Sequence, residues 1–255
     1  MYSLGRVSYI NSLPLFCAGS PGAFSVVEAV PARLNRGVRE GALDASLISR
    51  WTYTKQIAQN YEILPQFCIG GDGEIFSVKL FSRYPIEELG DKKIFITGES
   101  GTSIRAFALI CRERYKFDFF ANRAGSIAEA DAVFLIGDAA LAFDGSFGGY
   151  SHVYDLGRMW KEFAPVPMIY AVVVVRRNLP FRARARLSDF FGKSVDAFRA
   201  SPESFFPVAR DMFARSTSSS ISDGLLDAYY RALIYKFDEK TFYAAIRFVD
   251  ECADI

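Results

Sequence analysis

Apolar and polar positions fall into short blocks along the chain, and these switch between the two-residue period of a strand and the spacing of a helical face. The apolar blocks predict strands at residues 3–9, 43–48, 75–83, 93–97, 132–136 and 170–176. Helical spacing predicts helices at residues 31–40, 103–115, 139–143, 184–199, 202–215, 223–235 and 238–252. Because strands alternate with helices over most of the chain, we expect an α/β fold with parallel sheets covered on both faces.

Two of the expected strands are long and separate the αβ blocks from one another. If the strands at 75–83 and 169–177 are crossovers, the middle block forms one lobe, and the first block joins the C-terminal helices in the other. We therefore predict a two-lobed protein with lobe 1 at residues 1–81 plus 177–255 and lobe 2 at residues 82–176. Open α/β sheets bind ligands beyond the carboxyl ends of their strands, so the expected central cleft lies between the lobes, at the crossovers.

The composition narrows the class of protein. Of the 255 residues, 51% are hydrophobic and 23% are charged, which is ordinary for a globular protein with a full core. Thirty basic and 29 acidic side chains give a formal net charge of +1, and this balance argues against a nucleic-acid binder, which needs a basic surface. The longest apolar run, at residues 168–175, is too short to cross a bilayer, so we expect no membrane partner.

The cysteines and histidine give no indication of a metal site. The four cysteines, at positions 17, 68, 111 and 252, are not spaced as metal ligands, and His152 is the single histidine. We expect reduced, mostly buried thiols in a cytoplasmic protein, since the first residues also lack the basic and apolar segments of a signal peptide. The sequence contains neither a Ser-His-Asp set nor a phosphate-binding glycine pattern.

Three junctions between a strand and a turn carry polar residues that would face the cleft. At the first, Asn11 follows Ser8 and Tyr9 at the end of the opening strand. An asparagine at such a place has two donors and an acceptor with which to orient a hydroxyl or a carboxylate. The alternative is that Asn11 only stabilises the turn before Pro14.

The second junction is the polar turn at residues 98–103, which precedes a helix. Ser100, Thr102 and Ser103 supply hydroxyls there, and the free amides of a helix N-terminus favour an anion. The alternative is a well-capped helix that holds no ligand. This turn is the best physical indication of a carboxylate ligand in the sequence.

The third junction is Gly137-Asp138, where another strand meets a helix. Asp138 has three possible roles, namely capping the helix, binding a substrate hydroxyl or bracing the hinge, and capping is favoured. Ser77, inside the first expected crossover, could point into the cleft, although a lone serine in a strand mostly has no chemical role. Asp72 and Glu74 could form an acid/base pair, but exposed acids in turns are more often solvated.

Several sequence blocks, which follow one another over nearly the whole chain, match those of a known enzyme family. The opening block is Gly5-Arg-Val-Ser-Tyr-Ile-Asn-Ser-Leu-Pro-Leu15. Later blocks are Leu34-Asn35, Gly41-Ala-Leu-Asp44 with Ser46, Ile48 and Ser49, Asp72-Gly-Glu-Ile-Phe-Ser-Val-Lys-Leu-Phe-Ser82, Leu135-Ile-Gly-Asp138, Tyr154-Asp-Leu-Gly157, Trp160-Lys-Glu162 and Tyr230-Arg-Ala-Leu-Ile-Tyr235. In these blocks the chain resembles the chorismate dehydratases of the futalosine route to menaquinone, which usually open Gly-x-Val-Ser-Tyr-Leu-Asn-Thr-x-Pro-Leu.

The resemblance implies a type 2 periplasmic-binding-protein-like fold and a lyase that dehydrates chorismate to 3-[(1-carboxyvinyl)oxy]benzoate with no metal and no organic cofactor. It implies that Asn11 and Ser77 are the catalytic positions. The corresponding turn in this family usually has the sequence Ala-Ser-Ala-Thr-Ser, whereas this chain has Glu99-Ser-Gly-Thr-Ser103. The substrate contacts that we expect are Ser8, Tyr9, Ser49, Ser100, Gly101, Thr102, Ser103, Gly137 and Asp138.

Two alternatives stay open. The sibling 1,4-dihydroxy-6-naphthoate synthase shares the fold, but the Val-Ser-Tyr-Ile-Asn-Ser and Leu-Ile-Gly-Asp blocks favour the dehydratase. A non-catalytic cytosolic binding protein or sensor for a small carboxylate is the alternative of a different class. Asn11 and Ser77 discriminate between an enzyme and a binder, since a binder has no turnover to lose. The expected partner is the small substrate alone, with the chain as a monomer or weak homodimer.

Overall fold

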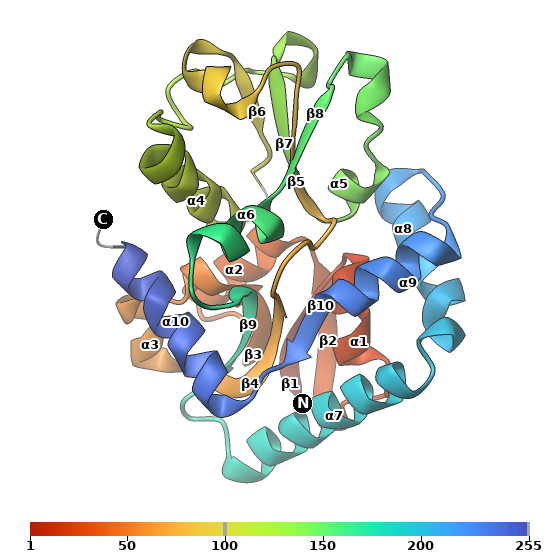
Figure 1. Cartoon of the computed structure of the whole chain (residues 1–255). Coiled ribbons are helices and arrows are strands. Elements are labelled where there is room, and N and C mark those ends of the chain that lie inside the picture. Colours follow the sequence, from red (N-terminus) through yellow and green to blue (C-terminus); the bar gives the residue numbers. More distant parts are fainter. Residues whose placement is uncertain (99–100, 254–255) are drawn as a thin grey trace.

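The computed structural model describes residues 1–98 and 101–253. It has two lobes, each built on one sheet, which lie one above the other in Figure 1. The lower lobe contains a six-stranded sheet of order β10-β4-β9-β3-β1-β2, and the upper lobe a four-stranded sheet of order β6-β7-β5-β8. The strands are β1 (Tyr2–Val7), β2 (Phe24–Ala29), β3 (Ala45–Ser49), β4 (Tyr61–Gly71), β5 (Val78–Ser82), β6 (Ile94–Ile96), β7 (Ala132–Ile136), β8 (His152–Asp155), β9 (Met168–Arg176) and β10 (Leu233–Lys236).

Helices pack against both sheets, with α4 beside the upper sheet and α7 below the lower one in Figure 1. The long helices bury one face and expose the other, as their apolar spacing predicts. The helices are α1 (Leu13–Phe16), α2 (Pro31–Arg39), α3 (Lys55–Asn60), α4 (Gly101–Ile110), α5 (Asp138–Ala142), α6 (Leu156–Phe163), α7 (Phe181–Ala200), α8 (Phe206–Thr217), α9 (Asp223–Ala232) and α10 (Glu239–Ala253). Two short helical turns contribute to the site, η1 (Ile10–Ser12) and η2 (Arg50–Thr52).

Both sheets are mixed, so the expectation of parallel sheets is wrong for several pairs. β1 is parallel to β2 and β3, and β6 to β7. In contrast, β9 is antiparallel to both β3 and β4, and β10 is antiparallel to β4. In the small sheet, β5 is antiparallel to both β7 and β8. The direction of β9 follows from the path of the chain: it returns from the upper lobe, begins at the lobe boundary and runs away from it, whereas β1, β3 and β4 run towards it.

Three strands of the large sheet, β2, β4 and β10, were not predicted. β4 contains Pro65 and Gln66, where the register to β9 shifts and Gln66 has a φ of 76°. A proline at a bulge is compatible with a strand but interrupts the apolar run that would reveal it. The helix expected at 223–235 ends at Ala232, because the next residues form β10 and pair with β4.

The chain passes between the sheets outside the strands themselves. It leaves the large sheet after β4, crosses at residues 72–77 and enters the small sheet with β5, which is shorter than the strand expected at 75–83. It returns after α6, at residues 164–167, and β9 then lies wholly in the large sheet. The lobe boundaries at 1–81 plus 177–255 and 82–176 stay a prediction.

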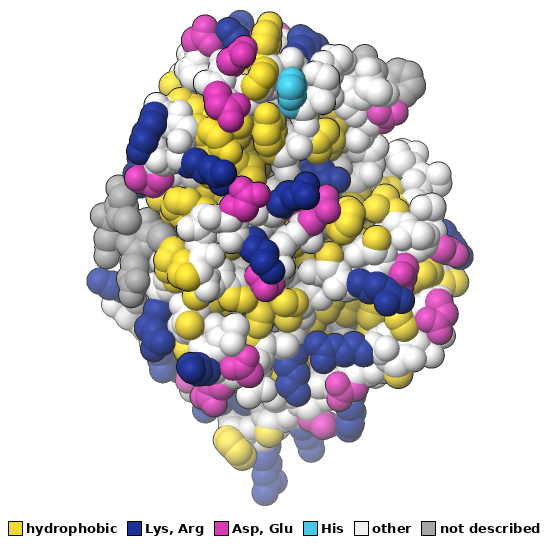
Figure 2. Space-filling view, viewed as in Figure 1, with side chains coloured by type: hydrophobic (Ala, Val, Ile, Leu, Met, Phe, Trp, Pro, Cys, Tyr) yellow, Lys and Arg dark blue, Asp and Glu magenta, His cyan; other side chains and the backbone are white. Residues whose placement is uncertain are grey.

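Aromatic side chains fill much of the core in both lobes. In the upper lobe Phe107, Phe119 and Phe134 pack with ring centroids 4.8 to 5.4 Å apart. In the lower lobe Phe16 and Phe191 make an edge contact at 5.5 Å. Tilted and edge-on aromatic pairs of this kind add to the free energy gained by burying their surface. On the outside, Figure 2 shows basic and acidic side chains interspersed over the visible face, without a patch of one sign.

Candidate active site

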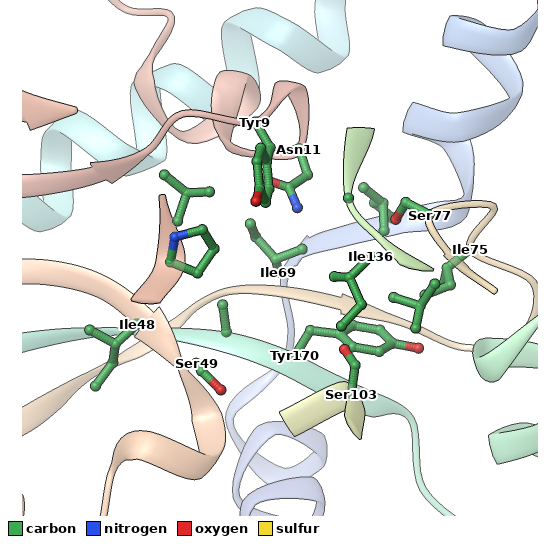
Figure 3. Close-up of a pocket in the computed structure, with 16 residues that line it drawn as sticks. Tyr9, Asn11, Ile48, Ser49, Ile69, Ile75, Ser77, Ser103, Ile136 and Tyr170 are labelled. Carbon is green, nitrogen blue, oxygen red and sulfur yellow. The ribbon is translucent and has the colours of Figure 1, made fainter. Parts of the chain in front are cut away.

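A pocket lies between the two sheets, where β1, β3 and β7 end, and the empty space in the pocket and its solvent-open mouth is about 570 Å³. Its walls are mainly apolar, and a few hydroxyl and amide groups point into it (Figure 3). Ligand sites of small organic molecules have this construction, with apolar walls that bury the ligand and a few polar groups that orient it. The lining residues are Val7, Tyr9, Asn11, Pro31, Ile48, Ser49, Ile69, Ile75, Ser77, Val78, Ser103, Ile136, Gly137, Tyr170, Ala171 and Leu233.

The pocket brings together most of the residues predicted from the sequence. Six of the eleven predicted positions line it, namely Tyr9, Asn11, Ser49, Ser77, Ser103 and Gly137. Three further positions lie beside it: Gly101 and Thr102 adjoin the lining residue Ser49, and Asp138 follows the lining residue Gly137. Ser8 is not among the lining residues, and Ser100 lies outside the described residues.

Asn11 lies on η1, a turn whose backbone is fixed from several sides. Ser12 donates from its hydroxyl to Val7 O at 2.6 Å, and Tyr230 donates from its hydroxyl to Ile10 O at 3.0 Å. The Ile10 amide donates to the Asp138 carboxylate at 3.2 Å. Within the described residues, the buried amide oxygen of Asn11 has no hydrogen-bond partner. A buried polar atom without a partner is costly unless a ligand satisfies it, so the Asn11 amide is ready to orient one.

Ser77 ends the crossover at residues 72–77 and is only 4% exposed. Its carbonyl accepts a hydrogen bond from the Gly137 amide at 2.7 Å, which joins the crossover to the end of β7. Tyr229 lies behind it: burial raises the pKa of the Tyr229 hydroxyl, and Ser77 offsets part of that rise. In Figure 3 Asn11 and Ser77 occupy the upper part of the pocket, and Ser49 and Ser103 the lower part.

The first turn of α4 supplies both a pocket wall and a contact between the lobes. Ser103 lines the pocket at the N-terminus of this ten-residue helix, where a carboxylate is favoured by the helix dipole. The Thr102 hydroxyl shares a hydrogen bond of 2.6 Å with the Ser49 hydroxyl and accepts one of 3.0 Å from the Trp51 amide. Thr102 thus joins the upper lobe to the end of β3.

Replacing Thr102 by valine keeps the shape of the side chain and removes its hydroxyl. The Trp51 amide and the Ser49 hydroxyl then lose a partner in a buried place, and we expect the free energy of unfolding to fall by about 1–3 kcal/mol. Urea unfolding followed by circular dichroism measures this change. Thr217→Val is the matched control, since the Thr217 hydroxyl donates to Phe213 O and accepts from the Ser219 amide at the end of α8, within one lobe. An equal loss in both variants would contradict a contribution from the lobe contact.

Asp138 makes a second contact between the lobes. Its buried carboxylate accepts hydrogen bonds from the Ile10 amide and, at 2.6 Å, from the Ser216 hydroxyl of α8. The favoured role of capping α5 is wrong, because Gly137 occupies the N-cap position and Asp138 is the first helical residue. These hydrogen bonds suit the bracing of the hinge, and a contact of Asp138 with the substrate stays a prediction.

The electrostatics of the pocket come from neutral groups. None of the described residues that line it carries a charged side chain. Among the described residues, no group of three His, Cys, Asp or Glu side chains lies close enough together to hold a metal ion. Asp72 pairs instead with Lys161 at 3.1 Å on the surface, so an acid/base pair with Glu74 does not face the pocket.

Several lining residues carried no signal in the sequence. Tyr170 and Ala171 lie in the apolar run of β9, Ile69 in the unpredicted strand β4, and Leu233 at the start of β10. Their place in the wall depends on how distant strands pair, which the local pattern of apolar positions does not encode. No helix in the described part of the chain is both long and apolar enough to span a bilayer.

Known proteins match both the sequence and the fold. The sequence model of a protein family described as "Menaquinone biosynthesis" matches residues 2–254. Chorismate dehydratase of Thermus thermophilus is 30% identical over 197 residues, which cover 70% of this chain and 71% of that protein. Both similarities confirm the family predicted from the sequence blocks.

Solved structures with low sequence identity share the fold. Protein AF1704 of Archaeoglobus fulgidus superposes with a TM-score of 0.77 at 17% identity, covering 99% of this chain and 96% of that chain. The periplasmic aliphatic sulphonate binding protein SsuA of Escherichia coli has a TM-score of 0.64 at 11% identity, covering 99% and 91%. These likenesses confirm the predicted two-lobed periplasmic-binding-protein-like fold.

Proposed function

The chain belongs to the menaquinone-biosynthesis family, and from this premise and the pocket geometry we propose that it is a chorismate dehydratase. The reaction removes one water from chorismate and gives 3-[(1-carboxyvinyl)oxy]benzoate. The observation that carries the proposal is the side-chain amide of Asn11: its oxygen is buried without a partner among the described residues, and Asn11 lines a mainly apolar pocket together with Ser77. A small ring carboxylate that bears one hydroxyl to be lost fits such a pocket.

Binding of the substrate uses the two ends of the pocket. The ring carboxylate of chorismate lies at the N-terminus of α4 against Ser103, where amide dipoles favour an anion without a basic residue. The apolar side chains of Ile48, Ile69 and Ile136 contact the ring. Asn11 and Ser77, at the other end of the view in Figure 3, orient the enolpyruvyl side chain and the departing hydroxyl.

The elimination breaks the C3–H and C4–O bonds and forms the double bond that completes the benzene ring. The diene connects C3 to the ring carboxylate, so donors aimed at that carboxylate stabilise the charge that develops as the proton leaves. The described lining residues include no carboxylate, lysine or histidine to serve as a strong base, and in the proposed mechanism the substrate's own side-chain carboxylate takes the proton. The departing hydroxyl takes up the proton that the side-chain carboxylate removed from C3 and leaves as water, which restores the carboxylate, with Ser77 and Asn11 as its hydrogen-bonding partners. Lobe contacts exclude bulk water and hold one reactive conformer.

The proposed reaction implies a biosynthetic route and a cellular compartment for the protein. Within menaquinone biosynthesis, a chorismate dehydratase belongs to the futalosine route, and we place the reaction in the cytoplasm. The free thiols of Cys17, Cys68 and Cys111 suit a reducing compartment.

The decisive test is incubation of purified, metal-free protein with chorismate, followed by chromatography with mass detection. We expect a product that is lighter than chorismate by one water. Unchanged chorismate together with thermal stabilisation of the protein would indicate a binding protein or sensor instead. Unchanged chorismate without stabilisation would assign the pocket to another ligand.

A further inference from the structure

The crossover that carries Ser77 contains an unusual backbone turn. Phe76 has a φ of 64°, in the left-handed region that side chains other than glycine rarely adopt. The Ser77 amide donates to Ile75 O at 2.7 Å, so the chain reverses over three residues. Such a conformation persists only when its surroundings hold it, and it is common at functional sites.

The side chain that holds this turn is Asp155, which is 6% exposed. Its two carboxylate oxygens accept hydrogen bonds from the Ile75 amide at 3.1 Å and from the Phe76 amide at 2.8 Å. One of them also accepts from Gly157 and Arg158 in the first turn of α6, at 2.9 and 3.2 Å. One carboxylate therefore joins the outgoing crossover to the helix that precedes the return to the large sheet.

Next to Asp155, the start of α6 and the crossover at residues 72–77 approach each other closely. A Cβ atom at Gly157 would lie 2.1 Å from the carbonyl oxygen of Gly73 and 2.9 Å from a methyl carbon of Ile75. Only glycine allows the start of α6 to come this near to the crossover. Asp155 and Gly157 thus explain the Tyr154-Asp-Leu-Gly157 block, whose residues are absent from the pocket lining.

We propose that Asp155 is a positioning residue of the reaction, whose carboxylate holds the left-handed turn at Phe76 and so presents Ser77 to the pocket. This inference rests on the proposed role of Ser77 in the dehydration. It assigns a function to a buried acid that does not touch the substrate. Loss of the carboxylate releases the turn, and the Ser77 hydroxyl moves away from the departing group.

The first experiment replaces Asp155 by asparagine, which keeps the volume but replaces one acceptor oxygen by an NH₂ donor. Displacement of a reacting group by about 1 Å costs on the order of 100-fold in rate, so we expect kcat for chorismate to fall by about that factor, with KM changed by only a few-fold. Asp131→Asn is the matched control, because Asp131 also accepts a backbone amide, that of Lys93, but lies away from the pocket. Wild-type kcat in Asp155→Asn would overturn the proposal.

A second pair of variants tests the turn without touching the buried acid. Glycine adopts the left-handed backbone at no steric cost, whereas a β-branched residue is an outlier there. We therefore expect Phe76→Gly to retain at least about tenfold more turnover than Phe76→Val, the reverse of the order that packing alone gives. Adding Phe76→Gly to Asp155→Asn should restore part of the lost kcat. Equal turnover of the glycine and valine variants would contradict the proposal even if Asp155→Asn does not fold.

Ser77→Ala separates this inference from the proposed function on which it rests. If Ser77→Ala retains full turnover, the proposed role of Ser77 is wrong. If Ser77→Ala loses turnover while Asp155→Asn and Phe76→Val keep it, only the positioning role of Asp155 is wrong.

Discussion

Replacement of Asn11 by alanine should lower the turnover of chorismate by roughly 100- to 1,000-fold, the range found when one preorganised donor is removed from an active site. The same change should leave the free energy of unfolding equal or slightly higher. The reason is that the Asn11 amide oxygen is buried without a partner among the described residues, and removing it relieves a desolvation cost. Steady-state kinetics and urea unfolding of the same preparation measure the two quantities.

A loss of turnover without a loss of stability would distinguish a role of Asn11 in the site from a purely structural role. A residue that only stabilises the turn before Pro14 would lose stability and turnover together, and that outcome would contradict the role of Asn11 in the site. Asn122→Ala is the control, since its side chain donates to Gly90 O on the surface of the upper lobe, away from the pocket. We expect wild-type turnover in this control.

The sequence predicted the parts of the site that depend on local chain chemistry. A strand that ends in a polar turn is visible in the pattern of apolar residues, and the turns at Asn11 and Gly137 both lie in the pocket wall as expected. The carboxyl ends of β1, β3 and β7 meet at one boundary because the fold has two crossovers, which the alternation of blocks also predicted.

The contacts that close the site are not local, and the sequence did not predict them. Thr102 was expected to bind an anion, but its hydroxyl bonds to Ser49, 53 positions away, and to the Trp51 amide. Asp138 was expected to cap a helix, but it bonds to Ile10 and Ser216 across the lobe boundary. The local sequence around a hydroxyl or carboxylate is the same whether the group binds a ligand, caps a helix or joins the lobes. Which partner it bonds to depends on how the two lobes pack together.

The second large effect is expected at Gly137, which precedes α5 and lines the pocket. Its φ is 69°, and an added Cβ would lie 2.8 and 2.9 Å from carbon atoms of the Tyr9 ring. Gly137→Ala therefore combines backbone strain of about 1–3 kcal/mol with overpacking of about 1–3 kcal/mol, and we expect the free energy of unfolding to fall by their sum. Turnover should fall too, because the Gly137 amide holds Ser77 O and the displaced Tyr9 ring would narrow the pocket.

Gly149 offers a comparison at a milder backbone conformation. Its φ of 71° and ψ of 21° lie in the ordinary left-handed region, whereas Gly137 combines a φ of 69° with a ψ of −144°, a region essentially restricted to glycine. An added Cβ at Gly149 meets nothing within 4 Å. Gly149→Ala should therefore show only the smaller strain of the left-handed backbone, with turnover unchanged. The difference between the two variants in urea unfolding then measures the additional backbone strain at Gly137 together with the cost of displacing the Tyr9 ring. If the two alanine variants lose the same stability, neither the backbone at Gly137 nor the Tyr9 ring resists an added side chain, and the large effect predicted at this position is wrong.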